Sequence, residues 1–258
     1  MVKNVTGYDL CKLLAGSFGT LAVLTEVTFK VLPAPEISLT LLLRPTDRVG
    51  GFAALRAAMG SAYDVASAAF LPASAGACSS VSELSGASSD LALIRLEGPE
   101  PSVRYRADAL RQLLLSHGSE IGEAGDGPSI TLWREIRDAA LLSEKTPILW
   151  RISVPPGSGP GILEALEPRL SLSWIADWAG GLLWLDAGEA EDGGAVAIRE
   201  AIAPSGGHAT LIRGPAELRA RIEVFQPQPP PLARLSARVK ESFDPKRILN
   251  PGRMYREV

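Results

Sequence analysis

Apolar and polar residues follow first a helical and then a strand-like pattern near the start of the chain. Asp9 precedes leucines at helical spacing in residues 10–14, so a short helix capped by Asp9 is expected. Glycines in residues 16–19 predict a tight turn after this helix. Alternate positions are apolar in residues 20–31, the period of a strand buried on one face, and Pro33 ends this run.

The rest of the chain repeats one order of elements. Strands are expected at residues 37–44, 65–71, 91–96 and 119–123, and again at 147–154, 172–177, 181–186 and 207–212. Helices are expected at residues 47–59, 101–117, 160–169, 190–203 and 232–243, with an inserted helical stretch at 127–142 and a loop at 73–90. We therefore predict an α+β fold, a duplicated ferredoxin-like (β-α-β-β-α-β) domain with antiparallel sheets and helices on one side. A generic α+β fold with the same element order is the alternative.

Composition excludes several classes of function. A chain of 258 residues with 46% hydrophobic content can bury a substantial core. Its net charge of −3 gives no basic face for nucleic acid, and no apolar run reaches the ~20 residues of a membrane span. Cys11 and Cys78 have neither CxxC spacing nor a nearby histidine, so we expect no metal site, no disulfide framework and a cytoplasmic location.

Two motifs at opposite ends of the chain resemble one family. They are KNVTGYDLCKLLAGSFGTLAVLTEVTFKVLP at residues 3–33 and FDPKRILNPGRMY at residues 243–255. Together they resemble the FAD-linked oxidases of the vanillyl-alcohol oxidase type. With HATLIRGP at residues 208–215, the chain is most similar to the FAD-binding E subunits of bacterial glycolate oxidases within that family. The resemblance implies that the two end segments lie together beside the flavin.

The resemblance also implies a domain organisation. Residues 1–35 would be the C-terminal remnant of the FAD-binding domain, residues 36–225 the cap or substrate domain, and residues 226–258 a tail returning toward the flavin domain. Family members carry a glycine-rich loop for the FAD pyrophosphate ahead of this region, and the sequence has no such loop. We therefore expect a C-terminal portion of a longer oxidase subunit, inactive alone and a weak binder of FAD.

Cofactor-binding residues are carried over from the family by position. They are Thr6, Gly7, Asp9, Ser17, Phe18, Gly19, Thr20, Leu21, Ala22, Val23, Asn250, Pro251 and Gly252. Glycine has no Cβ, so its backbone can approach a flat or anionic ligand closely. Phe18 and Ala22 depart from the family's Glu and Gly, and a side chain at position 22 narrows the approach to the cofactor. For the glycine turn alone, an ordinary helix-to-strand turn is the alternative.

Oxidation of a 2-hydroxy acid requires a cation for the carboxylate and a base for the hydroxyl proton. His208, Arg151 and Arg213 are the catalytic candidates, with structural roles in packing as the alternative. The resemblance implies oxidation of glycolate to glyoxylate, with a second flavoprotein subunit and an iron–sulfur subunit as partners that could hold the protein at the inner face of the membrane. The alternatives are a non-catalytic docking module of a multisubunit dehydrogenase and another FAD-linked hydroxy-acid or alcohol oxidase.

Overall fold

The chain forms two compact units. A computed structural model describes residues 7–84, 87–142, 147–256 and 258. Unit 1 comprises the described residues of the ranges 1–32 and 223–258, and unit 2 comprises those of the range 33–222. Each unit thus has its own set of contacts, and unit 1 is built from the two ends of the chain.

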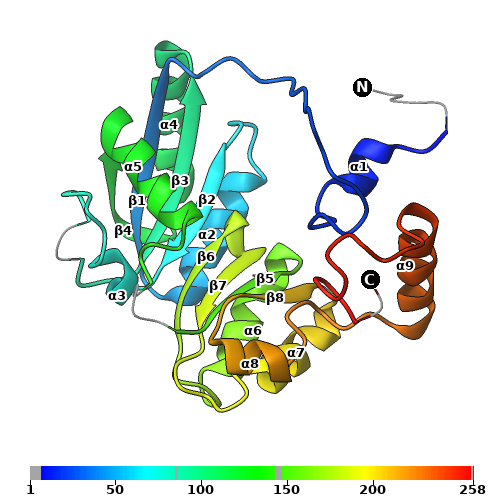
Figure 1. The fold of residues 1–258 in the computed structure, drawn as a ribbon. Coiled ribbons are helices and arrows are strands. Elements are labelled where there is room, and N and C mark those ends of the chain that lie inside the picture. Colours follow the sequence, from blue (N-terminus) through cyan, green and yellow to red (C-terminus); the bar gives the residue numbers. More distant parts are fainter. Residues whose placement is uncertain (1–6, 85–86, 143–146, 257) are drawn as a thin grey trace. The chain divides into compact units, whose positions relative to one another are not determined.

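Unit 2 contains one eight-stranded antiparallel sheet, in the order β4-β1-β3-β2-β6-β7-β5-β8 (Figure 1). The strands are β1 Ile37–Pro45, β2 Ser67–Leu71, β3 Leu91–Gly98, β4 Gly118–Ala124, β5 Leu149–Ser153, β6 Ser173–Asp177, β7 Leu182–Asp186 and β8 His208–Arg213. The helices of unit 2 are α2 Arg48–Met59, α3 Ala73–Gly76, α4 Glu100–Leu114, α5 Asp126–Arg137, α6 Gly159–Leu166, α7 Ala195–Ile202 and α8 Ala216–Arg221. The predicted mixture of helices and antiparallel strands is confirmed, and the short helices α3 and α8 were not predicted.

The sheet has two halves with the same order of main elements. β1, α2, β2, β3, α4 and β4 form the first half, and β5, α6, β6, β7, α7 and β8 form the second. Each half places its first strand between its third and fourth, and the halves meet where Phe70 of β2 pairs with Ala176 of β6. The two expected sheets are therefore one continuous sheet.

Strand β1 is buried on both faces because helices cover both sides of the first half. Leu42 lies in one hydrophobic cluster with Leu132 and Ile136 of α5. Side chains alternate along a strand, so the buried Leu41 and Leu43 lie on the opposite face, where α2 and α4 contact β1. The expectation that all helices pack on one side is therefore wrong here, because the inserted stretch folds as α5 onto the second face.

A buried polar network fixes α5 against β1. The Ser129 hydroxyl lies 2.9 Å from the hydroxyl of Ser38 and 2.7 Å from that of Thr40. The indole N–H of Trp133 donates to Thr40 Oγ1 at 2.8 Å. Since buried polar groups stabilise a fold only when they are paired, this network specifies where α5 lies on β1.

Aromatic stacking joins the two halves on the other face of the sheet. The rings of Phe52 and Phe70 are stacked with their centroids 4.8 Å apart, and Trp174 stacks on Phe70 at 5.8 Å. Arg48 lies over Trp174 and forms a bidentate ion pair with Glu167 at 2.8 Å. The hydrogen bond from Arg48 lowers the pKa of Glu167, so this pair stays ionised while linking α2 to the end of α6.

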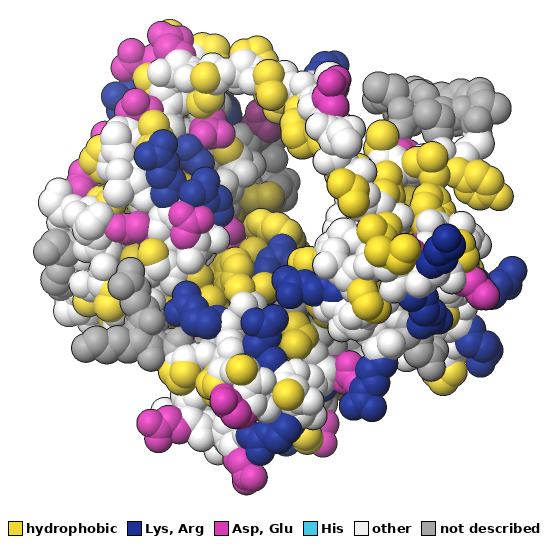
Figure 2. Space-filling view, viewed as in Figure 1, with side chains coloured by type: hydrophobic (Ala, Val, Ile, Leu, Met, Phe, Trp, Pro, Cys, Tyr) yellow, Lys and Arg dark blue, Asp and Glu magenta, His cyan; other side chains and the backbone are white. Residues whose placement is uncertain are grey.

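Unit 1 contains two helices, α1 Leu10–Leu14 and α9 Pro230–Phe243 (Figure 1). Asp9 caps α1 by accepting the Lys12 N–H at 3.1 Å, as predicted. The strand predicted at residues 20–31 is wrong, because this segment has neither helical nor strand structure. A strand requires a hydrogen-bonded neighbour, and no described strand pairs with this segment. Hydrophobic side chains lie at the surface along it (Figure 2). Phe29 and Val31 are 78% and 79% exposed.

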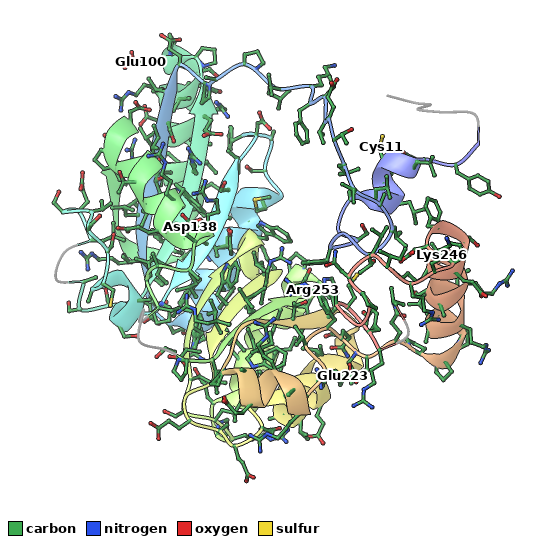
Figure 3. The ribbon with its side chains drawn as sticks, in the orientation of Figure 1. Cys11, Glu100, Asp138, Glu223, Lys246 and Arg253 are labelled. Carbon is green, nitrogen blue, oxygen red and sulfur yellow. The ribbon has the colours of Figure 1, made fainter. Side chains whose placement is uncertain are left out.

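Two further observations concern the surface of the described residues. None of the helices there has the length and apolar character that a membrane crossing requires. Cys11 on α1 (Figure 3) is free and exposed, and so is Cys78 after α3.

The network under α5 gives a stability prediction. Thr40→Val preserves shape but leaves the Trp133 indole N–H buried without its acceptor, so we expect a loss of roughly 1–3 kcal/mol in the free energy of unfolding. Urea denaturation followed by tryptophan fluorescence would measure it. Thr131→Val, at an exposed position on α5, is the matched control and should change stability by less than about 0.5 kcal/mol. Equal losses in the two variants would contradict the role given to Thr40.

Candidate functional site

The glycine turn after α1 is a compact loop with left-handed backbone. Gly16, Phe18 and Gly19 have φ of 80°, 52° and 73°. The Ser17 N–H donates to the Leu14 carbonyl at 3.1 Å, and the Ser17 carbonyl accepts from both the N–H and the hydroxyl of Thr20, at 3.0 and 2.8 Å. The turn therefore has a fixed shape set by its own backbone bonds.

A fully buried lysine holds this turn to the end of the chain. Lys240 of α9 is 0% exposed, and its ammonium group donates to the Thr20 carbonyl at 2.7 Å and to the Leu249 carbonyl at 2.7 Å. Its third bond, at 2.8 Å, is an ion pair with Asp244. All three donors of the ammonium are satisfied, which is the condition under which a buried charge is tolerated.

Asp244 links the lysine to the bend that follows α9. Its carboxylate also accepts the backbone N–H groups of Ile248 at 3.0 Å and Leu249 at 2.8 Å. The hydrogen bond from Lys240, assisted by these two N–H groups, lowers the pKa of Asp244 from 3.8 to about 2. The carboxylate is therefore ionised at all but strongly acidic pH.

Asn250 closes the contact between the two ends of the chain. Its side-chain amide donates to the Gly19 carbonyl at 3.0 Å, and its own φ is 43°. A Cβ at position 19 would lie 2.9 Å from the Asn250 amide nitrogen, so the approach requires glycine there. The predicted contact between the glycine turn and the terminal NPG bend is confirmed by these bonds.

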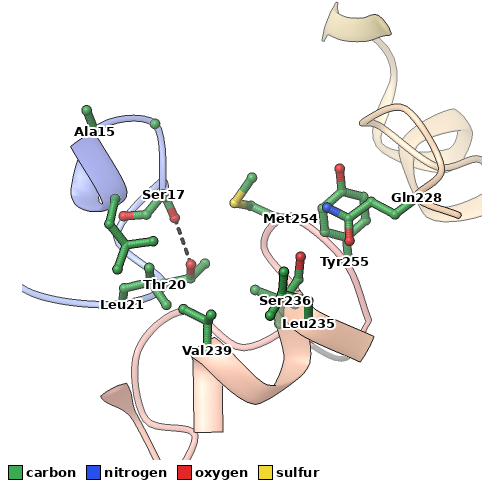
Figure 4. A pocket seen from close by; sticks show the side chains of 13 residues that line it. Ala15, Ser17, Thr20, Leu21, Gln228, Leu235, Ser236, Val239, Met254 and Tyr255 are labelled. Atoms are coloured by element: carbon green, nitrogen blue, oxygen red, sulfur yellow. Dashed lines mark hydrogen bonds between the residues drawn. The ribbon is translucent and has the colours of Figure 1, made fainter. Parts of the chain in front are cut away.

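Two pockets border the turn within unit 1. The first has a volume of about 300 Å³ and is largely apolar, with Ser17 and Thr20 on one side (Figure 4). Its remaining walls are formed by Leu13, Ala15, Gly16, Leu21, Gln228, Leu235, Ser236, Val239, Met254, Tyr255 and Val258. The second, of about 320 Å³, is lined by Leu14, Ser17, Gly19, Ala22, Val23, Leu24 and Asn250. The second pocket thus brings together five of the predicted cofactor-binding residues.

The other predicted cofactor residues lie elsewhere in unit 1. Thr20 and Leu21 line the first pocket, and Asp9 caps α1. Phe18 turns its ring toward Phe225, with centroids 5.0 Å apart. Gly7, Pro251 and Gly252 are exposed, and Thr6 lies outside the described residues. Phe18, which stands where the family has Glu, therefore makes an aromatic contact with Phe225. Ala22, which stands where the family has Gly, borders the second pocket.

The three catalytic candidates share one face of the second half of the sheet. Arg151 of β5 pairs with Thr210 of β8, two residues from His208, so Arg151 and His208 lie on the same face. A bulge then places Arg213 opposite Leu149, which shares the face of Arg151. Without this bulge, Arg213 would lie on the opposite face of the sheet.

Two indoles accompany Arg151 on that face. The guanidinium lies over the rings of Trp178 and Trp184, 5.6 and 6.0 Å from their centroids. Trp184 pairs directly with Arg151 across β5 and β7, and Trp178 comes from the turn between β6 and β7. Among the described residues, no carboxylate lies within 4.0 Å of Arg151. The Arg151 guanidinium is therefore stacked on aromatic rings without a direct ion pair to a described carboxylate, and Asp186, opposite Leu149, lies on the same face.

Sequence reasoning missed the burial of Lys240 and the contact of Trp178 with Arg151. A lysine four residues before an aspartate on an amphipathic helix is typical of an exposed pair, so nothing local indicated that Lys240 is buried. The contact of Trp178 with Arg151 depends on the neighbouring strands and could not be read from spacing. The described residues also hold no group of three His, Cys, Asp or Glu side chains suited to a metal ion.

Comparison with solved structures defines the class of fold. The chain matches an alkyldihydroxyacetonephosphate synthase with a TM-score of 0.59 at 14% identity, covering 96% of this chain and 50% of the synthase. It matches the 4-ethylphenol oxidase from Gulosibacter chungangensis with a TM-score of 0.53 at 12% identity, covering 88% of this chain and 55% of the oxidase. No family model matches the sequence. The chain therefore shares the fold of about half of each of these FAD-linked oxidases.

Sequence comparison finds a relative that is similar to this chain along its whole length. The chain is 35% identical over 262 aligned residues, covering all of this chain, to glycolate oxidase subunit GlcE of Escherichia coli (strain K12). It spans 60% of the length of that relative. The chain is therefore homologous along its whole length to GlcE, as the motifs at its two ends predicted.

Two shorter matches concern other oxidoreductases. One is 50% identity over 42 residues to glycolate oxidase subunit GlcD of Bacillus subtilis (strain 168), covering 16% of this chain and 9% of GlcD. The other is 46% identity over 41 residues to a D-lactate dehydrogenase of Anaerostipes hadrus, again covering 16% of this chain and 9% of the relative.

The low pKa of Asp244 gives a pH prediction. The folded state binds fewer protons than the unfolded state between pH 3.8 and about 2, so stability is complete above this window and is lost as pH falls through it. Hydrogen exchange of the α9 amides, corrected for intrinsic rates, should accelerate in that window.

Asp244→Asn should remove the acid dependence of α9 exchange and leave faster exchange at every pH. Asp138→Asn is the matched control, because Asp138 also has a lowered pKa but pairs with Arg137 on the surface of unit 2. An α9 that is equally protected at pH 2 and pH 5 would contradict the role of Asp244.

Proposed function

We propose that this chain is the part of an FAD-linked 2-hydroxy-acid oxidase subunit that contributes to the flavin site and carries the substrate groups, with glycolate oxidised to glyoxylate. The homology to GlcE supports the reaction. The observation that carries the proposal is the junction made by Lys240 and Asn250, which brings the glycine turn and the terminal bend to one pocket.

The domain roles follow from this function. Residues 1–35 are proposed as part of the FAD-binding domain, residues 36–225 as the cap domain and residues 226–258 as the tail that returns to the flavin domain. The cap domain is proposed to be a duplicated ferredoxin-like fold, which the matching element order of the two halves of the sheet supports.

The second pocket of unit 1 suits one end of a flavin. Leu14, Val23 and Leu24 offer apolar walls for a flat ring, and Ser17 and Asn250 offer polar groups at its edge. Gly19 permits close backbone approach, because a side chain there would displace Asn250. Binding of FAD by this chain alone is expected to be weak, since a pocket of about 320 Å³ holds only part of so large a cofactor.

The second half of the sheet carries the groups that a hydroxy acid requires. Arg151 is proposed to bind the carboxylate through its two parallel N–H groups, with Arg213 adding positive charge. His208 is proposed to accept the hydroxyl proton as the carbonyl forms. FAD, when bound, supplies the two-electron acceptor for the hydride that leaves the substrate carbon. The products would be a 2-oxo acid, a protonated histidine and the cofactor reduced by two electrons.

The partners are proposed from the resemblance. A second flavoprotein subunit and an iron–sulfur subunit would take the electrons onward and could hold the protein at the inner face of the membrane. The match to GlcD is short and supports only an evolutionary relationship with another glycolate oxidase subunit.

A pair of glycine variants tests the flavin site. Gly19→Ala and Gly16→Ala both place a side chain at positive φ, but only the Cβ at position 19 meets the Asn250 amide, while that at position 16 meets nothing within 4 Å. In the oxidase purified with this chain as its subunit, Gly19→Ala should lose most flavin per chain, measured by visible absorbance after gel filtration. Gly16→Ala should retain more flavin, and equal flavin content in the two variants would argue against the pocket.

Arginine variants test the substrate groups. Arg151→Gln should raise KM for glycolate by roughly tenfold or more with a smaller change in kcat, because a charge-assisted bidentate bond is lost. Arg151→Lys should restore little, since a point charge cannot replace the planar fork. Arg169→Gln, at an exposed ion pair with Glu200, is the control. Unchanged kinetics in Arg151→Gln would refute the assignment.

A further inference from the structure

The turn that carries Trp178 is held in an unfavourable backbone conformation. Trp178, Ala179 and Gly180 have successive φ of 52°, 54° and 100°. Glycine adopts such angles freely, but a bulky side chain is strained by them. A glycine or asparagine at position 178 would form the same turn with less strain, so the geometry of the turn gives no reason for an indole.

The strain at Trp178 is maintained from several sides. The Asp177 carboxylate accepts the Trp178 N–H at 2.7 Å, and the Trp178 carbonyl accepts the Gly181 N–H at 3.0 Å. The Gly181 carbonyl in turn accepts the N–H of Val154, just after β5, at 2.9 Å. A Cβ at Gly180 would lie 2.8 Å from a carbonyl oxygen of the 3-10 helix Pro156–Ser158. The turn is therefore anchored to β5 and to the segment after it.

Packing of the indole does not account for this arrangement, because Trp178 is 53% exposed. Its ring instead meets the guanidinium of Arg151, whose centre lies 5.6 Å from the ring centroid. Trp184 offers a second ring at 6.0 Å from the paired strand. Contact of a guanidinium with an aromatic face is favourable. It leaves the N–H groups at the edge of the planar guanidinium available for hydrogen bonds.

We propose that Trp178 is a positioning residue, which holds Arg151 so that its N–H groups receive the carboxylate of a small 2-hydroxy acid. This proposal rests on the proposed function, in which Arg151 binds that carboxylate. Arg151 has no carboxylate within 4.0 Å among the described residues, so its charge is available to a ligand. The strained turn thus has a role, which is to keep an aromatic face beside a flexible side chain.

Binding of glycolate to the full 258-residue chain, measured by ligand-observed NMR at constant ionic strength, tests the proposal. Trp178→Leu should weaken binding by about five-fold, because leucine lacks the aromatic face, and Trp178→Phe should restore affinity to within about two-fold of the unaltered chain. Arg151→Gln should abolish binding. Ala179→Gly is the matched control, since it relieves strain in the same turn, keeps the indole and should leave affinity unchanged.

Thermal unfolding separates positioning from structural support. Trp178→Asn should leave the melting temperature of unit 2 unchanged or higher, because strain is relieved and an exposed ring is lost, while glycolate affinity falls. A lower melting temperature with unchanged affinity would overturn the proposal.

The outcomes also distinguish this inference from the proposed function. If Arg151→Gln loses glycolate and Trp178→Leu binds like the unaltered chain, the positioning role is wrong and the carboxylate role of Arg151 stands. If Arg151→Gln binds like the unaltered chain, or the unaltered chain binds no glycolate, the carboxylate site is wrong and the positioning role falls with it.

Discussion

One buried ammonium group organises the part of the chain that combines its two ends. Lys240 makes three hydrogen bonds: to the carbonyl of Thr20, 220 residues away in the sequence, to Asp244 at the end of its own helix, and to the carbonyl of Leu249 beyond that helix. A buried charge is costly unless its donors are all used, so the geometry around it is narrowly specified. Asn250 and Gly19 meet as a consequence, and the second pocket depends on that meeting.

Unit 2 is organised differently, around a continuous sheet. The two halves of this sheet differ in how helices cover their faces. In the first half, α5 and the helices α2 and α4 bury both faces of β1. In the second half, one face carries arginine, histidine and threonine side chains on adjacent strands. The two halves thus share one order of main elements but differ in the side chains that they present on this face.

Local patterns were sufficient for most elements and insufficient for the site. Strand β1 and helix α2 were predictable because the spacing of apolar residues within each segment is a local signal. The run at residues 20–31 has the same alternation but no strand beside it, so pairing rather than pattern decided its structure. The face on which Arg213 lies depends on a bulge. The burial of Lys240 depends on the Thr20 carbonyl, 220 residues away in the sequence, and on the Leu249 carbonyl beyond the end of α9. Such features arise from tertiary contacts, which the spacing of apolar residues within one segment does not reveal.

The division of the chain between two units has a spectroscopic consequence. All five tryptophans, at positions 133, 150, 174, 178 and 184, belong to unit 2, whereas unit 1 has only tyrosine and phenylalanine. Indole emission during denaturation therefore follows the sheet and is silent about the lysine-centred junction. A tryptophan introduced at Phe225, where the ring already contacts Phe18 and Tyr255, would give that junction an optical signal of its own.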